Sequence, residues 1–228
     1  MSIYLIISYQ SSIIEDIEEE GIIHNFDSFY DCYKRNNKSY NWLSFFDFDE
    51  YLELKNKNQN IQEFLGNKRY QKCINIKINW LIYSDNNLIY YENKLLKDRF
   101  LKPSINNSLN RIIKSTVRGN LKVNYWQNLN NPHSSFNNFT ACSSSGKVTD
   151  SNNYYVTPPD YEYAILKHYF TKTIEEYCNK IKRGRSDAQI IFNNYALINV
   201  LNKYFFKINE KTKNKLYYLK KNFNISFD

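Results

Sequence analysis

A run of large apolar residues, Trp42–Phe48, leads into several carboxylates and limits the folds that this chain can adopt. The sequence there reads WLSFFDFDE, so Asp47, Asp49 and Glu50 follow the aromatic side chains closely. A nearly continuous apolar run of this length is typical of a strand buried on both faces, as in a parallel sheet. Because residues i and i+2 of a strand point to the same side, Asp47 and Asp49 are expected to face each other.

Two neighbouring carboxylates are costly unless a cation neutralises them, and no basic residue adjoins this pair in the sequence. Mg²⁺ and Mn²⁺ prefer oxygen ligands and share them with phosphates. Open α/β sheets bind ligands beyond the carboxyl ends of their strands. The pattern therefore favours a divalent metal site at Asp47 and Asp49. The alternative is that the acids cap a following helix, because a motif this short is common.

Strand-like and helix-like patterns alternate along the chain, which predicts an α/β fold with a doubly wound, mostly parallel sheet. Strands are expected at Ile3–Ile7, Ile22–His24, Trp42–Phe48, Cys73–Ile82 and just before His168. Helices are expected at Ser11–Glu20, from Asp27 or Ser28 to Asn36–Ser39, and at Ile61–Leu65, Thr173–Ile181 and Ala188–Phe206. The Asn- and Ser-rich segment Asn137–Asn153 is expected to be a mobile loop.

A second cluster of chemically useful residues lies between Leu166 and Asp187. His168 follows an apolar stretch and is either a structural histidine or a metal ligand. Thr173 and Glu176 have the spacing of a capping box at the start of a helix. The basic side chains beyond that helix form either a solvated face or a phosphate clamp, because arginine binds phosphate oxygens in bidentate fashion; these residues are Lys182, Arg183 and Arg185.

Two segments together carry a family resemblance. FYDCYKRNNKSYNWLSFFDFDEYLEL and LKHYFTKTIEEYCNKIKRGRSD resemble the two signature segments of the family-2-like and family-92 glycosyltransferases, a group formerly labelled a domain of unknown function. Between them, Trp80, the Lys114-Ser115 pair and Asn131-Pro132-His133 occur in the order that the family has.

The resemblance, which spans about Ile22–Gln189, implies a GT-A fold, Rossmann-like and doubly wound, for a domain of residues 1–206. The sequence pattern of residues 207–228 predicts a basic tail that is helical in part. The resemblance also implies metal-dependent transfer of a sugar from a nucleotide-diphosphate donor to a glycan or lipid-linked acceptor, with Mn²⁺ or Mg²⁺ as cofactor. The implied metal ligands are Asp47, Asp49 and His168. The implied donor-binding residues are Lys182, Arg183, Arg185, Lys114 and Trp80.

Asp187 and Glu50 are the candidate catalytic carboxylates. An inverting transfer needs a carboxylate that takes the proton of the acceptor hydroxyl. Asp187 follows a basic stretch that favours its ionised form. The alternative for Asp187 is a helix cap ahead of Ala188. Asp85 and Asp160 are further candidates for the base, beside Glu50.

The N-terminal region departs from the family pattern. The family's first strand–helix unit is expected to be missing, and the turn Ile7–Ser12 (ISYQSS) lacks the Asp and Asn that the resemblance would place there. A truncated reading frame, a second chain that supplies the missing part, and loss of donor binding all explain this difference. The alternative function is therefore a catalytically impaired remnant, or a carbohydrate- or nucleotide-binding relative, of such an enzyme.

The formal net charge of +8 fits an enzyme of anionic substrates, a protein with peripheral membrane contact, or a nucleic-acid binder. Basic and aromatic residues form no recognisable DNA- or RNA-binding motif, so nucleic acid is not expected as a partner. The four cysteines have no metal-ligand spacing and are expected to be free thiols. Together with the shortness of the apolar run Ile3–Ile7, this predicts a cytoplasmic protein.

Overall fold

A computed structural model describes residues 4–9, 25–121, 132–133, 139–183, 217–218 and 221 of the 228-residue chain. The chain divides into two units. The first consists of Met1–Leu81 and Ser108–His168, and the second of Ile82–Asn107 and Tyr169–Asp228. The expected helices Ser11–Glu20 and Ala188–Phe206 and the expected strand Ile22–His24 lie outside the described residues, as does nearly all of the tail 207–228.

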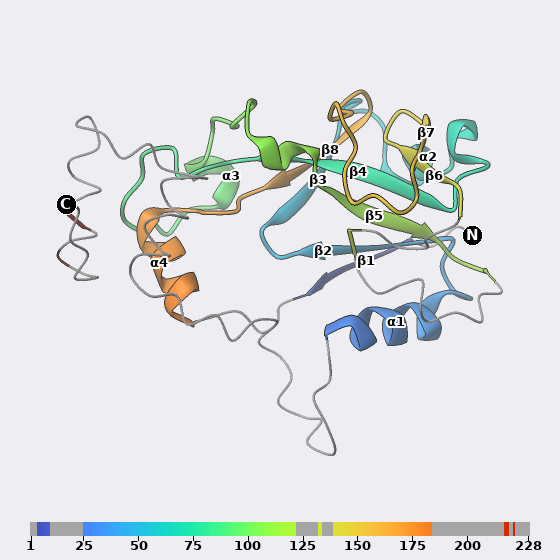
Figure 1. The fold of residues 1–228 in the computed structure, drawn as a ribbon, viewed down its shortest axis with the longest axis horizontal. Helices are drawn as coiled ribbons and strands as arrows, with labels where there is room; N and C mark the ends of the chain where they lie inside the picture. Colours follow the sequence, from blue (N-terminus) through green and yellow to red (C-terminus); the bar gives the residue numbers. More distant parts are fainter. Residues whose placement is uncertain are drawn as a thin grey trace, which may run out of the picture. The chain divides into compact units, whose positions relative to one another are not determined.

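The first unit is built on a mixed sheet (Figure 1). Its main path runs in the order β1-β2-β5-β4-β6-β7. The strands of this path are β1 (Tyr4–Tyr9), β2 (Trp42–Asp47), β4 (Asn75–Ile82), β5 (Ile113–Arg118), β6 (Ala141–Ser143) and β7 (Val148–Thr149). Off this path, β3 (Glu50–Leu54) pairs with β8 (Ala164–His168), which also pairs with β4.

The α/β class is confirmed, but the described strands pair mostly antiparallel rather than parallel. β1 runs parallel to β2, and β4 runs parallel to β6. The pairs β2–β5, β4–β5, β6–β7 and β3–β8 are antiparallel. Apolar runs show only that both faces of a strand are covered, and they carry no information about the direction of its neighbours. For this reason the sequence pattern led to the prediction of a mostly parallel sheet, whereas most of the described strand pairs are antiparallel.

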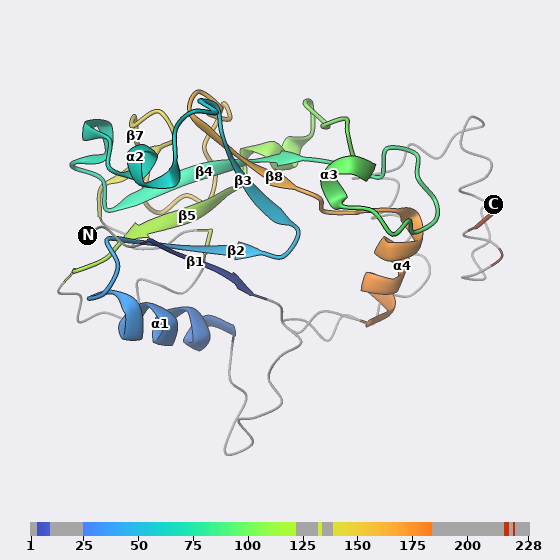
Figure 2. The ribbon, with the colours of Figure 1, turned by 180° about the vertical axis from the view of Figure 1, so that it is seen from behind.

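Helix α1 (Asn25–Asn36) covers one face of this sheet beside β1 and β2 (Figure 2). Tyr33 packs with Leu43, Phe45 and Val117 in a buried cluster. The rings of Phe29 and Phe45 meet edge to face, with centroids 5.4 Å apart. The Tyr33 hydroxyl donates to the carbonyl oxygen of Arg118 at 2.7 Å, so the helix is tied to β5 by a polar contact as well as by packing.

The polar face of β4 is buried as fully as its apolar face. Polar and apolar residues alternate along β4, yet Asn75, Lys77 and Asn79 are all inaccessible to solvent. The Lys77 ammonium donates to the backbone carbonyls of Asp150, Ser151 and Asn153. Burial lowers the pKa of Lys77 to about 8. These bonds compensate for removing the ammonium from water and hold the segment after β7 against the strand.

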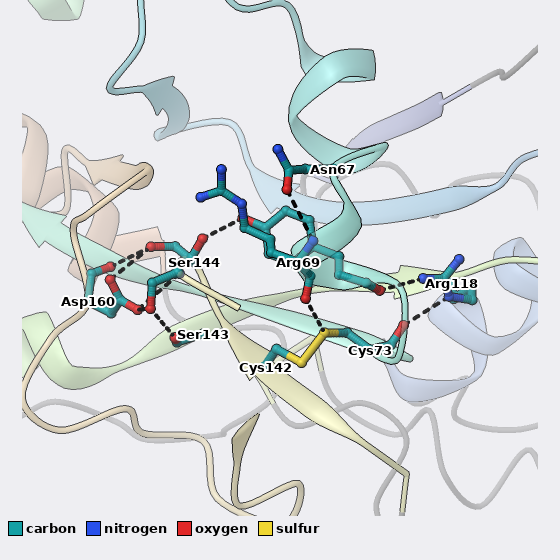
Figure 3. Close-up of a disulfide and its surroundings, with 10 residues drawn as sticks. Asn67, Arg69, Cys73, Arg118, Cys142, Ser143, Ser144 and Asp160 are labelled. Carbon is teal, nitrogen blue, oxygen red and sulfur yellow. Dashed lines mark hydrogen bonds between the residues drawn. A yellow bond between two sulfur atoms is a disulfide. The ribbon is translucent and has the colours of Figure 1, made fainter. Parts of the chain in front are cut away.

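The prediction of a mobile loop at Asn137–Asn153 is wrong for the part that the structure describes. That part contains β6 and β7, and Cys142 on β6 forms a disulfide with Cys73 just before β4 (Figure 3). The prediction that all four cysteines are free thiols is therefore also wrong, and Cys32 and Cys178 are the two cysteines outside the disulfide. Cysteines 69 residues apart show no spacing motif, so their pairing depends on sheet topology.

A polar network beside the disulfide fixes the turn after β6. The Asp160 carboxylate accepts hydrogen bonds from the hydroxyl of Ser144 and from the backbone N–H of Ser145 (Figure 3). Burial alone would raise the pKa of Asp160, but hydrogen bonds to its carboxylate hold the pKa at about 2. The Arg118 guanidinium donates to the carbonyls of Cys73 and Tyr70. Asp160 was a further candidate for the catalytic base, but its carboxylate binds the residues of this turn instead.

Shorter elements complete the described structure. In the first unit these are α2 (Ile61–Leu65), with a capping box formed by Asn60 and Glu63, and two 3-10 turns, Lys68–Tyr70 and Ser108–Arg111. The second unit contains α3 (Leu96–Arg99) and α4 (Ile174–Arg183). The predicted capping box at the start of α4 is confirmed, because Thr173 Oγ1 accepts from the N–H of Glu176 while the Glu176 carboxylate accepts from the N–H of Thr173.

In the second unit the Glu176 carboxylate also binds both terminal nitrogens of the buried Arg99, at 2.7 and 3.1 Å. This bidentate pair links α4 to the chain around α3. Within the described ranges, no helix is both long and apolar enough to cross a membrane.

Candidate active site

The carboxylate motif lies at a turn rather than within one strand. β2 ends at Asp47, Phe48 and Asp49 form the turn, and β3 begins at Glu50. The sequence pattern predicted that the two aspartates lie on the same side of one strand. This prediction is wrong, because Asp47 ends β2 and Asp49 lies in the turn. The reading of these acids as helix caps is also wrong, because a strand follows them. Phe48 is 51% exposed, whereas Asp49 is buried at 8%.

A buried lysine neutralises the first carboxylate of the motif. Lys114 Nζ lies 2.9 Å from Asp47 Oδ2 and 3.5 Å from Glu50 Oε2. Burial alone would lower the pKa of Lys114, but the carboxylates of Glu50 and Asp47 outweigh burial and raise it. The sequence offered no basic neighbour for Asp47, because β5 brings Lys114 to it across a separation of 67 residues.

Glu50 is the most deeply buried carboxylate of the site. Its side chain has no solvent exposure, and burial raises the pKa of its carboxyl, although Lys114 and His168 act in the opposite direction. Oε2 accepts the backbone N–H of Asp47 at 2.9 Å, which closes the turn between β2 and β3. Oε1 has no hydrogen-bond partner within the described part of the chain.

The antiparallel pair β3–β8 brings His168 to the motif. In its register, Glu50 lies directly opposite His168, and directly opposed residues project from the same face of a sheet. His168 Nε2 lies 3.6 Å from Asp49 Oδ1, and Nδ1 lies 3.9 Å from Glu50 Oε1. The structure therefore places one ring nitrogen toward each of two carboxylates.

Aromatic rings pack against the imidazole of His168. The Trp80 ring centroid is 4.3 Å from that of His168 and 5.2 Å from that of His133. Burial lowers the pKa of His133 to about 4, so this ring is neutral near pH 7. Its Nδ1 lies 2.7 Å from the carbonyl of Ile113, and because a carbonyl only accepts, Nδ1 carries the proton. Trp80 Nε1 is buried and lacks a hydrogen-bond partner among the residues described.

The donor set at this position suits a metal that is shared with a substrate. No group of three or more His, Cys, Asp or Glu with metal-binding geometry occurs among the described residues. Asp49 and His168 nevertheless supply an oxygen and a nitrogen close together. Mg²⁺ is commonly held by one or two carboxylates plus substrate phosphates rather than by a complete protein cage. Asp49 and His168 thus fit such an ion, with Asp47 nearby but paired to Lys114.

The remaining predicted site residues are not brought to this cluster by anything the structure describes. Lys182 and Arg183 are the last residues of α4 in the second unit, and their side chains lie outside the described part. Arg185 and Asp187 lie outside it altogether. The contacts that sequence reasoning missed include those of Lys114 with Asp47 and Glu50, and that of Glu50 with His168.

A comparison with models of protein families identifies a family for this chain. The sequence model of the family described as glycosyltransferase family 92 matches residues 9–183, which include the first signature segment, all but the last four residues of the second, and the strands between them. No curated protein matches the chain.

Proposed function

The chain belongs to glycosyltransferase family 92, and from this premise we propose that it transfers a sugar from a nucleotide-diphosphate donor to a glycan or lipid-linked acceptor with the help of Mn²⁺ or Mg²⁺. The main support for this proposal is the short distance of 3.6 Å between His168 Nε2 and Asp49 Oδ1, beside the end of β2. The parallel pair β1–β2, which leads to Asp47, supports a GT-A arrangement of this part of the sheet.

Asp49 and His168 would hold the metal, which supplies Lewis acidity to the leaving diphosphate. Lys114 pairs with Asp47 and Glu50 and thereby holds both carboxylates beside the proposed metal ligands. In the transfer, the bond between the anomeric carbon and the diphosphate oxygen breaks, and the diphosphate leaves with the electron pair. The acceptor oxygen bonds to the anomeric carbon and gives up its proton to a base.

Hydrolysis of a panel of nucleotide sugars, with water as the acceptor, tests this function. We expect release of nucleoside diphosphate that requires Mn²⁺ or Mg²⁺ and stops on chelation, because both proposed ligands act through the ion. Binding of Mn²⁺ and nucleoside diphosphate with no release from any donor would favour a binding relative of the enzyme. Release that persists after exhaustive chelation would contradict the metal-dependent mechanism.

Asp187 is our candidate for the base of an inverting transfer. Replacing Asp187 by asparagine should abolish transfer and leave thermal stability almost unchanged, because asparagine caps helices as well as aspartate does but takes up no proton. Turnover and melting temperature of the purified variant provide the measurement. Unchanged turnover would assign Asp187 to a helix cap and direct the search for the base to Asp85.

A further inference from the structure

The side chain of Glu50 is positioned to act on His168 rather than on a substrate. It has no solvent exposure, so an acceptor hydroxyl has no access to it in this structure. Its Oε2 is occupied by the Asp47 backbone N–H and the Lys114 ammonium. Its Oε1, which has no hydrogen-bond partner in the described ranges, lies 3.9 Å from His168 Nδ1.

The register of β3 and β8 makes this arrangement a property of the fold. Glu50 and His168 are direct partners across the strand pair, and Leu52 and Leu166 are the next partners on the same face. Leu166 is completely buried, so a register slip of one residue would expose it and is disfavoured. Trp80 packs against the imidazole and limits its rotation.

We propose that Glu50 is a positioning residue that accepts the Nδ1–H of His168 and thereby fixes the tautomer whose Nε2 lone pair points toward Asp49. This inference rests on the proposed metal-dependent function. Histidines that bind metals almost always donate their second ring N–H to a carboxylate, carbonyl or water, and this contact orients the ring and raises its basicity. The 3.9 Å separation is longer than a hydrogen bond, so in the metal-free protein the buried Glu50 carboxylate favours a proton on Nδ1 through its charge, and a hydrogen bond is expected to form when Nε2 is engaged.

The tautomer of His168 in the metal-free protein tests the inference directly. Imidazole ¹⁵N chemical shifts distinguish the two tautomers, and the three histidines of the chain can be assigned by replacing His24 and His133 singly. We expect the Nδ1–H form in the wild type and in Glu50→Gln, which keeps an oxygen acceptor. Glu50→Leu should shift His168 toward the Nε2–H form. Lys114 retains Asp47 as its partner in Glu50→Leu, which favours a folded variant.

Asp47→Asn is the matched control, because it removes the other carboxylate that pairs with Lys114 and should leave the tautomer unchanged. Titration with Mn²⁺ alone should show affinity about 10- to 100-fold lower for Glu50→Leu, with most of it restored in Glu50→Gln. An Nε2–H form in the wild type, or the same tautomer in the wild type and Glu50→Leu, would overturn the inference. A wild type that binds no Mn²⁺ would contradict the proposed metal function, while the tautomer would still decide the role of Glu50.

Discussion

Replacing Asp49 by asparagine is expected to lower sugar transfer about a thousandfold, because the side chain loses the charge that holds the metal against the donor. Metal stabilisation of a leaving group contributes several kcal/mol to the barrier, and about 4 kcal/mol corresponds to a factor of about a thousand in rate. Asparagine has nearly the same size as aspartate, so the turn between β2 and β3 should persist. Initial rates of donor hydrolysis at saturating Mn²⁺ measure the effect.

Glu162→Gln is a suitable control for this replacement. Glu162 is an exposed carboxylate just before β8, and it takes no part in the cluster around Asp49. The Glu162→Gln replacement changes the net charge of the protein by the same amount as Asp49→Asn. It should leave the rate of donor hydrolysis within a factor of about two of the wild-type rate, because exposed charges are screened. Equal losses in the two variants would show that net charge, rather than metal binding at Asp49, controls the rate.

Removing the disulfide is expected to lower the free energy of unfolding by about 4 kcal/mol, the entropy of closing a loop across its sequence separation of 69 residues. The Cys73→Ala/Cys142→Ala variant and wild-type protein with reductant should both unfold at lower urea concentration than oxidised wild type. Cys32→Ala, which removes a free and half-buried thiol, serves as the control. Equal unfolding midpoints with and without reductant, or an intact mass with four free thiols, would contradict the bond.

The disulfide also removes one argument that the sequence offered about the cellular compartment. The expectation of a cytoplasmic protein rested partly on four free thiols, and two of the four cysteines are paired. Disulfides form and persist in oxidising compartments and are rare in the cytosol. The redox state of Cys73 and Cys142 in protein isolated from its native source therefore bears directly on the compartment in which the protein resides.

Local features of the fold were predictable because local patterns determine them. The apolar run Trp42–Phe48 predicted β2, and the aromatic spacing after Asp27 predicted α1. The Thr173 and Glu176 spacing predicted the start of α4. Strand β3 was missed, because EYLEL is short and alternates weakly, and β5 was missed because IKSTVR contains several polar residues that are buried by neighbouring strands.

Six of the predicted site residues, named from the sequence and from its family resemblance, lie together in the first unit, but their pairing was not predicted. These residues are Asp47, Asp49, Glu50, Lys114, His168 and Trp80. Which of them interact depends on the antiparallel pairs β3–β8 and β4–β5, and a single sequence does not specify such pairs. For the same reason, the sequence suggested a metal as the cation beside Asp47, where the structure has the ammonium of Lys114.

The proposed function requires Asp49 and His168 to hold a divalent metal that is shared with a nucleoside diphosphate. Calorimetric titration of UDP in the presence of Mn²⁺, on wild type and Asp49→Asn, tests it most directly because it needs no knowledge of the sugar or the acceptor. We predict a saturable heat for the wild type that depends on Mn²⁺ and is lost in Asp49→Asn. Equal heats from the two proteins would contradict the proposal.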